Sequence, residues 1–253
     1  MRFNNNIALT GPQVLLVPYD PHHVPRYHEW MEDAAIREAT ASDRLTLDEE
    51  YENQTSWREA PDKLTFIICE PARDAGDMGH PASSRTAIVA GEADTPDRMI
   101  GDVNMFLTPW DGDDGEGEEE KGKAYVNAEI DIMIADPTHR GKGLGRATVA
   151  TFLLFIHSNL DGILAEYASA SSEAKKPELK DVVAKINAGN QGSIKLFTGM
   201  GFSQRGGVNY FGEIELVLEG LGVKDGKVEK ELLASGAASK CVYDRSHLLF
   251  DHI

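Results

Sequence analysis

The stretch 129–145 holds the residue types best suited to chemistry in this chain. Two carboxylates, Glu129 and Asp131, precede a turn that contains three glycines, Gly141, Gly143 and Gly145. Glycine has no Cβ, so such a turn lets the backbone bend sharply and approach a ligand closely. The unpaired N–H groups and the dipole of the helix that follows favour a bound phosphate. The turn is therefore predicted to bind a pyrophosphate.

The nearby charges support this interpretation, and the spacing restricts the kind of nucleotide. Arg140, Lys142 and Arg146 place positive charge in a chain whose net charge is −17. A P-loop requires Ser or Thr after its lysine, but Gly143 follows Lys142. The Gly-x-Gly-x-x-Gly fingerprint of dinucleotide folds also fails, because Arg146 or Thr148 stands at its last position. A nicotinamide-dependent oxidoreductase is therefore disfavoured.

Two motifs together resemble those of a known family. Arg140-x-x-Gly143-x-Gly145 after a strand resembles the acetyl-CoA pyrophosphate motif of the GCN5-related N-acetyltransferases (GNAT). The segment 190–202 is similar to that family's Asn-x-x-Ser/Ala-Ile-x-Leu-Tyr/Phe-x-x-x-Gly-Phe signature. Further similarity, over roughly residues 1–218, is to the N-acetyltransferase 9-like branch. It is carried by the segments 26–31, 45–57, 101–104 and 133–135.

The resemblance implies a fold and a cofactor site. The fold would be α/β (α+β), a mixed, mostly antiparallel central sheet flanked by helices, with two splayed strands that hold acetyl-CoA as co-substrate. The pantetheine arm would follow the backbone of Met133 and Ile134, and an N–H near Met133 would polarise the thioester carbonyl. Asn190 would hold the arm from the opposite side. The implied cofactor-binding residues are Met133, Ile134, Arg140, Gly141, Lys142, Gly143, Leu144, Gly145, Arg146, Asn190, Ser193 and Phe197.

The implied reaction is transfer of an acetyl group to a primary amine of a protein or peptide. An amine is mostly protonated at neutral pH, so a base must remove a proton before attack. Glu129 and Asp131 are the candidates, since residues two apart on a strand share a face. Glu129 is the first choice. Two solvated strand carboxylates without a catalytic role are the alternative interpretation.

Two residues depart from the family pattern. Phe197 stands where many relatives have a tyrosine that protonates the departing thiolate, and Lys185 stands where some have a glutamate base. Tyr210 is a candidate substitute hydroxyl. These departures support an alternative function, an acyl-CoA-binding or protein-interaction module with little turnover. The acceptor and the oligomeric state are not defined by the sequence.

Alternating hydrophobic patterns predict the elements that position these residues. The predicted strands are 14–19, 64–69, 99–107, 124–135, 182–187 and 211–218, and the predicted helices are 23–31, 47–57, 145–160 and 191–200. One domain over 1–222 is expected, with polar insertions near 71–97, 111–123 and 162–181. A C-terminal extension over 223–253 would add a short helix near 227–234 and a weakly ordered end.

The first two predicted helices carry aromatic and acidic residues. Tyr27, Trp30, Tyr51 and Trp57 are interpreted as core. In related transferases these helices border the acceptor groove, so four acids on them are candidates to attract a cationic substrate: Glu29, Glu32, Glu49 and Glu50.

Composition narrows the class of partner and the compartment. The acidic balance, 42 acids against 25 Lys and Arg, argues against nucleic-acid binding. His23 and His28, like His247 and His252, have the wrong spacing for helical metal ligands, so no metal site is predicted. Two cysteines indicate a reducing compartment, cytoplasmic or nuclear. The longest apolar stretch, 149–156, is too short to span a membrane, so no membrane partner is expected.

Overall fold

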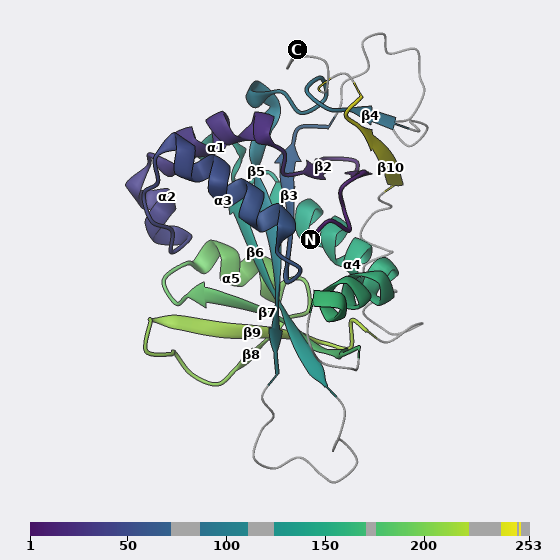
Figure 1. The fold of residues 1–253 in the computed structure, drawn as a ribbon. Helices are drawn as coiled ribbons and strands as arrows, with labels where there is room; N and C mark the ends of the chain where they lie inside the picture. The colour runs from purple at the N-terminus through teal and green to yellow at the C-terminus, as the bar shows by residue number, and fades with distance from the viewer. Residues whose placement is uncertain (72–86, 111–123, 171–175, 223–238, 247, 249–253) are drawn as a thin grey trace.

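The strands form one continuous mixed sheet in a computed structural model that describes residues 1–71, 87–110, 124–170, 176–222, 239–246 and 248 (Figure 1). Its order is β4-β10-β1-β2-β3-β5-β6-β7-β9-β8. Only β4·β10 and β6·β7 are parallel among these pairs. The mostly antiparallel sheet flanked by helices confirms the predicted fold class.

The strands are β1 (Ile7–Thr10), β2 (Leu15–Pro18), β3 (Lys63–Cys69), β4 (Ala87–Val89), β5 (Met99–Pro109), β6 (Tyr125–Ile134), β7 (Glu178–Asn187), β8 (Ser203–Arg205), β9 (Glu213–Glu219) and β10 (Ser239–Asp244). The α-helices are α1 (Val24–Met31), α2 (Ala34–Ala39), α3 (Leu47–Glu59), α4 (Leu144–Ala170) and α5 (Gln191–Thr198). Three short 3-10 helices are η1 (Pro21–His23), η3 (Pro96–Arg98) and η5 (Pro137–His139). Every strand and helix predicted within the described residues overlaps an observed one, whereas β1, β4, β8, β10 and α2 were not predicted.

Alternate residues of the central strands send their side chains to opposite faces of the sheet. On β3, Phe66 and Ile68 join the core under α4, while Ile67 and Cys69 join the core under α1. Figure 1 shows α1, α2 and α3 together on one side of the sheet and α4 on the other. Asp131, Met133, Asp102 and Asn104, described below, share the α1–α3 side of the sheet.

The helix α4 is longer than predicted, since it continues past Leu160 to Ala170. It is long and apolar enough, by length and composition, to cross a membrane. Its apolar side chains, including Phe152 and Ile156, are nevertheless those that pack against the sheet. The same pattern is expected of the core helix of a globular domain.

Within the described residues, parts of two predicted polar insertions belong to helices and strands. The first, 71–97, contains β4 and the buried Asp94. The third, 162–181, is mostly the end of α4 and the start of β7, because apolar residues such as Ile163 and Leu164 keep this part of α4 in the core. The second lies outside the described residues.

The C-terminal extension contributes a strand to the sheet, β10, which was not predicted, and the last residues of the chain lie outside the described residues. β10 lies between β1 and β4, and its residues Cys241 and Tyr243 are buried. The helix predicted near 227–234 lies outside the described residues. The 1–222 domain therefore shares its sheet with the extension.

Candidate functional site

The strands β6 and β7 pair only over their first halves. Their parallel ladder runs from Tyr125 opposite Glu178 to Glu129 opposite Val183, whereas β6 pairs with β5 as far as Ile134. In Figure 1 the β7–β9 portion of the sheet runs across the view while β5 and β6 run up it. The backbone of β6 after Glu129 therefore presents one edge that has no strand partner among the described residues.

The direction of the backbone groups decides which residues face this gap. Ala135 donates its N–H to Ile100 O at 2.9 Å, toward β5. Backbone groups alternate in direction along a strand, so those of Met133 also face β5 and those of Ile132 and Ile134 face the gap. A Cβ on Gly101 would lie 1.8 Å from Met133 O, which agrees with this direction. Of the N–H groups near Met133, those of Ile132 and Ile134 therefore face the gap.

The glycine turn connects this edge of β6 to α4. Gly141 and Gly143 have φ angles of 73° and 83°, in the left-handed region that favours glycine. The bond from Ala147 N to Gly143 O is 3.0 Å long. The N–H groups of Leu144, Gly145 and Arg146 precede it and have no carbonyl partner within the helix. Such a helix N-terminus suits an anion.

The three basic residues around the turn have different surroundings. Arg140 donates to Ile134 O at 2.9 Å and to Ala135 O at 3.1 Å, so it fastens the turn to the end of β6. Arg146 donates to Gly199 O at 2.7 Å, next to the end of α5. Lys142 is exposed. Arg140 therefore has a structural role, and its predicted contact with the cofactor stays a prediction.

The residues of the second motif, 190–202, belong to α5 and the segment that follows it. Asn190 is the N-cap of α5, and its Oδ1 accepts from Ser193 N at 3.1 Å. Phe197 is only 2% exposed and packs edge-on against Phe202, with ring centroids 5.1 Å apart. Phe197 thus belongs to the core in this structure, and its contact with the cofactor also stays a prediction. Tyr210, the proposed substitute hydroxyl, is 96% exposed on the loop before β9.

The two predicted carboxylates of β6 have different neighbours. Glu129 forms an ion pair with Lys185 of β7, with Oε2 and Nζ 2.6 Å apart. This contact raises the pKa of Lys185. Lys185, which departs from the family pattern, therefore holds the carboxylate that the sequence placed first as a base.

Asp131 has no ion pair or side-chain hydrogen bond within the described part of the chain. It is exposed to solvent, but neighbouring protein atoms remove part of its hydration. This desolvation, together with the negative charges of Glu129 and Asp102, raises the pKa of Asp131 to about 7. A carboxylate with such a pKa is suited to proton transfer near neutral pH.

Of the four acids suggested on the first helices, three already have partners. Glu29 pairs with Arg26 at 2.6 Å, Glu32 pairs with Arg44 at 2.6 Å, and Glu49 accepts from the N-cap Thr46. Glu50 differs from them because it is buried, at 2% exposure, and this burial raises its pKa.

A second buried carboxylate, Asp102 on β5, was not predicted to have a functional role. It accepts from Asn104 Nδ2 at 2.7 Å and from the Tyr27 hydroxyl at 3.3 Å. Burial nevertheless raises the pKa of Asp102 to about 6. In the sequence, Asp102 was marked only as part of the segment 101–104 that resembles the family. The structure adds the strand register, which brings Asp102 and Asn104 onto the same face of the sheet as Asp131.

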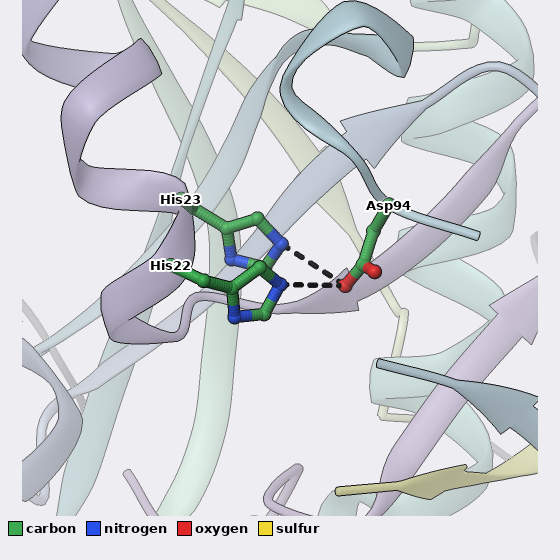
Figure 2. Close-up of side chains that lie close together, drawn as sticks. All are labelled: His22, His23 and Asp94. Atoms are coloured by element: carbon green, nitrogen blue, oxygen red, sulfur yellow. Dashed lines mark hydrogen bonds and ion pairs between the residues drawn. The ribbon is translucent and has the colours of Figure 1, made fainter. Parts of the chain in front are cut away.

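His22, His23 and Asp94 form another cluster (Figure 2). Asp94 Oδ2 accepts from His23 Nε2 at 3.0 Å, from His22 Nε2 at 3.2 Å and from the hydroxyl of Tyr243. Burial opposes ionisation of Asp94, but the bonds from His22 and His23 outweigh it and hold its pKa well below the ordinary value.

The geometry of this cluster does not fit a metal centre, although three ligand-type side chains converge. His23 Nδ1 accepts the backbone N–H of Asp20 at 3.0 Å, so the ring proton lies on Nε2, the atom that faces Asp94. Binding a metal through Nε2 would move that proton to Nδ1, against the Asp20 N–H. The cluster is therefore a hydrogen-bonded contact between η1, the segment after β4, and β10.

Known proteins share this sequence and fold. Residues 13–203 match the family described as acetyltransferase (GNAT) domain. An N-acetyltransferase 9-like protein of Dictyostelium discoideum is 36% identical over 87% of this chain and 88% of its own length. Human alpha/beta-tubulin-N-acetyltransferase 9 is 34% identical over 95% of this chain and 100% of its own length. In fold, the chain is similar to spermidine N-acetyltransferase from Vibrio cholerae, with a TM-score of 0.51 and 14% identity over 81% of this chain and 93% of that one.

Proposed function

The chain belongs to the GNAT acetyltransferase family, and from this we propose how its residues transfer an acetyl group from acetyl-CoA to a primary amine of a protein. The observation that carries the proposal is the partnerless edge of β6, which leads directly into the glycine turn and the N-terminus of α4. This arrangement offers backbone N–H groups to the pantetheine arm and to the pyrophosphate of acetyl-CoA.

The described residues fit acetyl-CoA as co-substrate. The N–H groups of Leu144, Gly145 and Arg146 would bind the pyrophosphate, and Lys142 would add charge at the surface. The backbone of Ile132 and Ile134 would pair with the amides of the pantetheine arm. Since the side chain of Arg140 already binds Ile134 O, the N–H of Ile134 is the donor available to the thioester carbonyl.

For the base, we propose Asp131 in place of Glu129. Asp131 takes a proton from the ammonium of the acceptor, and the free amine attacks the thioester carbonyl carbon. A C–N bond forms, the C–S bond breaks, and the second proton of the attacking nitrogen passes to the released thiolate, so that the products are the acetylated amine and CoA. A thiolate is a tolerable leaving group, since a thiol has a pKa of about 8.5, so no side-chain proton donor is needed. This accommodates the buried Phe197.

For the acceptor, we propose a cytoplasmic protein, with tubulin as the first candidate. The support is the human relative, named alpha/beta-tubulin-N-acetyltransferase 9, which aligns over its whole length with this chain. Both cysteines are buried and neither takes part in a disulfide, in keeping with a reducing compartment. α/β-Tubulin incubated with the enzyme and labelled acetyl-CoA should gain label, and mass spectrometry of peptides would locate it. If tubulin gained no label while control proteins in the same assay did, this choice would be contradicted.

Titration calorimetry with acetyl-CoA tests the cofactor site. Wild type should bind, and a Gly143→Glu, Gly145→Glu double variant should lose binding while it retains its circular dichroism spectrum. Release of CoA in the presence of free-amine peptides then tests catalysis. Binding without release would favour the alternative function, an acyl-CoA-binding module with little turnover.

A further inference from the structure

Two carboxylates are buried on the α1–α3 side of the sheet, and within the described residues neither pairs with a lysine or an arginine, although His28 acts electrostatically on Glu50. Glu50 of α3 and Asp102 of β5 are each 2% exposed. Neither forms an ion pair within the described residues, and the hydrogen-bond partners of Asp102 are neutral. A buried carboxylate without a counter-charge is costly, so its presence calls for a cation that arrives from outside.

Aromatic side chains connect the two carboxylates. The rings of Tyr19 and Tyr27 lie 5.1 Å apart, and burial together with the charges of Glu50 and Asp102 raises the pKa of both phenols. The hydroxyl of Tyr27 donates to Asp102, whereas the hydroxyl of Tyr19 is buried without a hydrogen-bond partner in the described structure. Phenol faces and carboxylates together suit an ammonium group.

A second unsatisfied group points to a ligand at the same place. Asn104 is 6% exposed, and its Nδ2 donates to Asp102, but its Oδ1 has no partner in the part of the chain described. Thr65, opposite Asn104 on β3, likewise has a buried, unpartnered Oγ1. Native structures rarely leave buried polar atoms unsatisfied, so these oxygens await a donor.

The register of the sheet places these groups next to the proposed base. Asn104 lies directly opposite Asp131 on β6, and Asp102 lies opposite Met133. Asp102 and Asp131 are therefore diagonal neighbours on one face, with Cα atoms about 7–8 Å apart. The exposed carboxylate of Asp131 marks where this face opens to solvent.

We propose that Tyr19, Tyr27, Glu50, Asp102 and Asn104, here called the ammonium cluster, bind the acceptor amine in its protonated form, and that Asp102 and Glu50 set the specificity for a cationic acceptor. This inference rests on the proposed function, because the ammonium held there is the one that loses its proton to Asp131. A terminal α-ammonium and a lysine ammonium share the required chemistry.

Paired binding measurements test the charge that the cluster recognises. The probes are a lysine-free peptide with a free α-amine, an N-blocked peptide with one lysine, and the acetylated form of each. Calorimetry in the presence of CoA gives Kd for all four. For the free-amine peptide that wild type prefers, Kd should rise about tenfold or more in Asp102→Asn and in Glu50→Gln. This is the effect expected when a hydrogen bond to a charged group is lost. The acetylated peptide, which has no charge at that site, should bind as before.

Controls separate recognition from folding and from the proposed function. Glu52→Gln, an exposed acid on the same helix as Glu50, should match wild type. The KM for acetyl-CoA should be unchanged in all three variants, and the Tm of Asp102→Asn at neutral pH should not fall, because an uncompensated buried charge is removed. Equal weakening of the amine and acetylated peptides, unchanged amine binding, or a lower Tm would overturn the inference. Absence of CoA release from wild type would instead refute the proposed function.

Discussion

Asp131 and Glu129 lie two residues apart on β6, yet within the described residues only Glu129 is held in an ion pair. The ammonium of Lys185 lies 2.6 Å from Oε2 of Glu129. Desolvation and neighbouring negative charge raise the pKa of Asp131 to about 7. Environment, and not residue type, therefore separates two chemically equivalent acids.

A pH profile follows from this assignment. Asp131 must be deprotonated to act, so kcat/KM should fall about tenfold per pH unit below a pH of about 7. Asp131→Asn should lower kcat/KM roughly 10²–10⁴-fold and abolish this acid limb. In Glu129→Gln, the fall of kcat/KM at acid pH should remain. An Asp131→Asn enzyme with an unchanged profile, measured by CoA release, would exclude Asp131 as the base.

The sequence indicated which residues belong to the candidate site, but it did not indicate which side chains they contact. Glu129, Asp131 and the glycine turn were predictable because their spacing along one strand and turn fixes their placement. The pairing of Glu129 with Lys185 and the burial of Asp102 depend on the register between strands distant in sequence. Local patterns do not encode that register, so these interactions emerged only from the structure.

At the scale of elements, the approach of β5 to β6 depends on the glycine at position 101. A Cβ there would lie 1.8 Å from Met133 O, so the two strands could not keep their present register. Gly101→Ala should lower the free energy of unfolding by about 2–3 kcal/mol or more, comparable to overpacking a core. Urea denaturation measures this. Gly207→Ala, where a Cβ meets nothing within 4 Å, is the matched control and should leave stability nearly unchanged.

The elements that sequence missed are short or lack a clear period. The strong apolar runs of β3, β5 and α4 were predicted, because each buries a long hydrophobic face. β1 and β10 are four and six residues long, and Val242 of β10 is 54% exposed. Such strands are stabilised by pairing with neighbours more than by their own pattern.

For the molecule as a whole, Asp94 joins three distant parts of the chain. It accepts from His22 and His23 near the N-terminus and from Tyr243 near the C-terminus. Asp94→Asn should destabilise the protein by roughly 3–5 kcal/mol, as for removal of one partner of a buried pair. Tyr243→Phe should cost about 1–3 kcal/mol. Their effects should be less than additive in a double-mutant cycle, because both remove one shared bond. Additive effects would show that the hydroxyl contact contributes nothing.

The pH dependence of this contact has a defined sign. The pKa of Asp94 is lowered in the folded state, so its contribution to stability is complete above the unfolded value of 3.8 and is lost as the pH falls below that value. Acid titration of unfolding by circular dichroism should therefore show a steeper loss below about pH 4 in wild type than in Asp94→Asn.

The position of β10 between β1 and β4 has a consequence for synthesis in the cell. A ribosome extends the chain by about 5–20 residues per second, so roughly ten to forty-five seconds separate the completion of β2 from that of β10. During that interval the nascent chain has no β10 to cover the outer edge of β1. Open strand edges are templates for aggregation. The yield of this protein in the cell thus depends on how well that edge is shielded while the polypeptide is still attached to the ribosome.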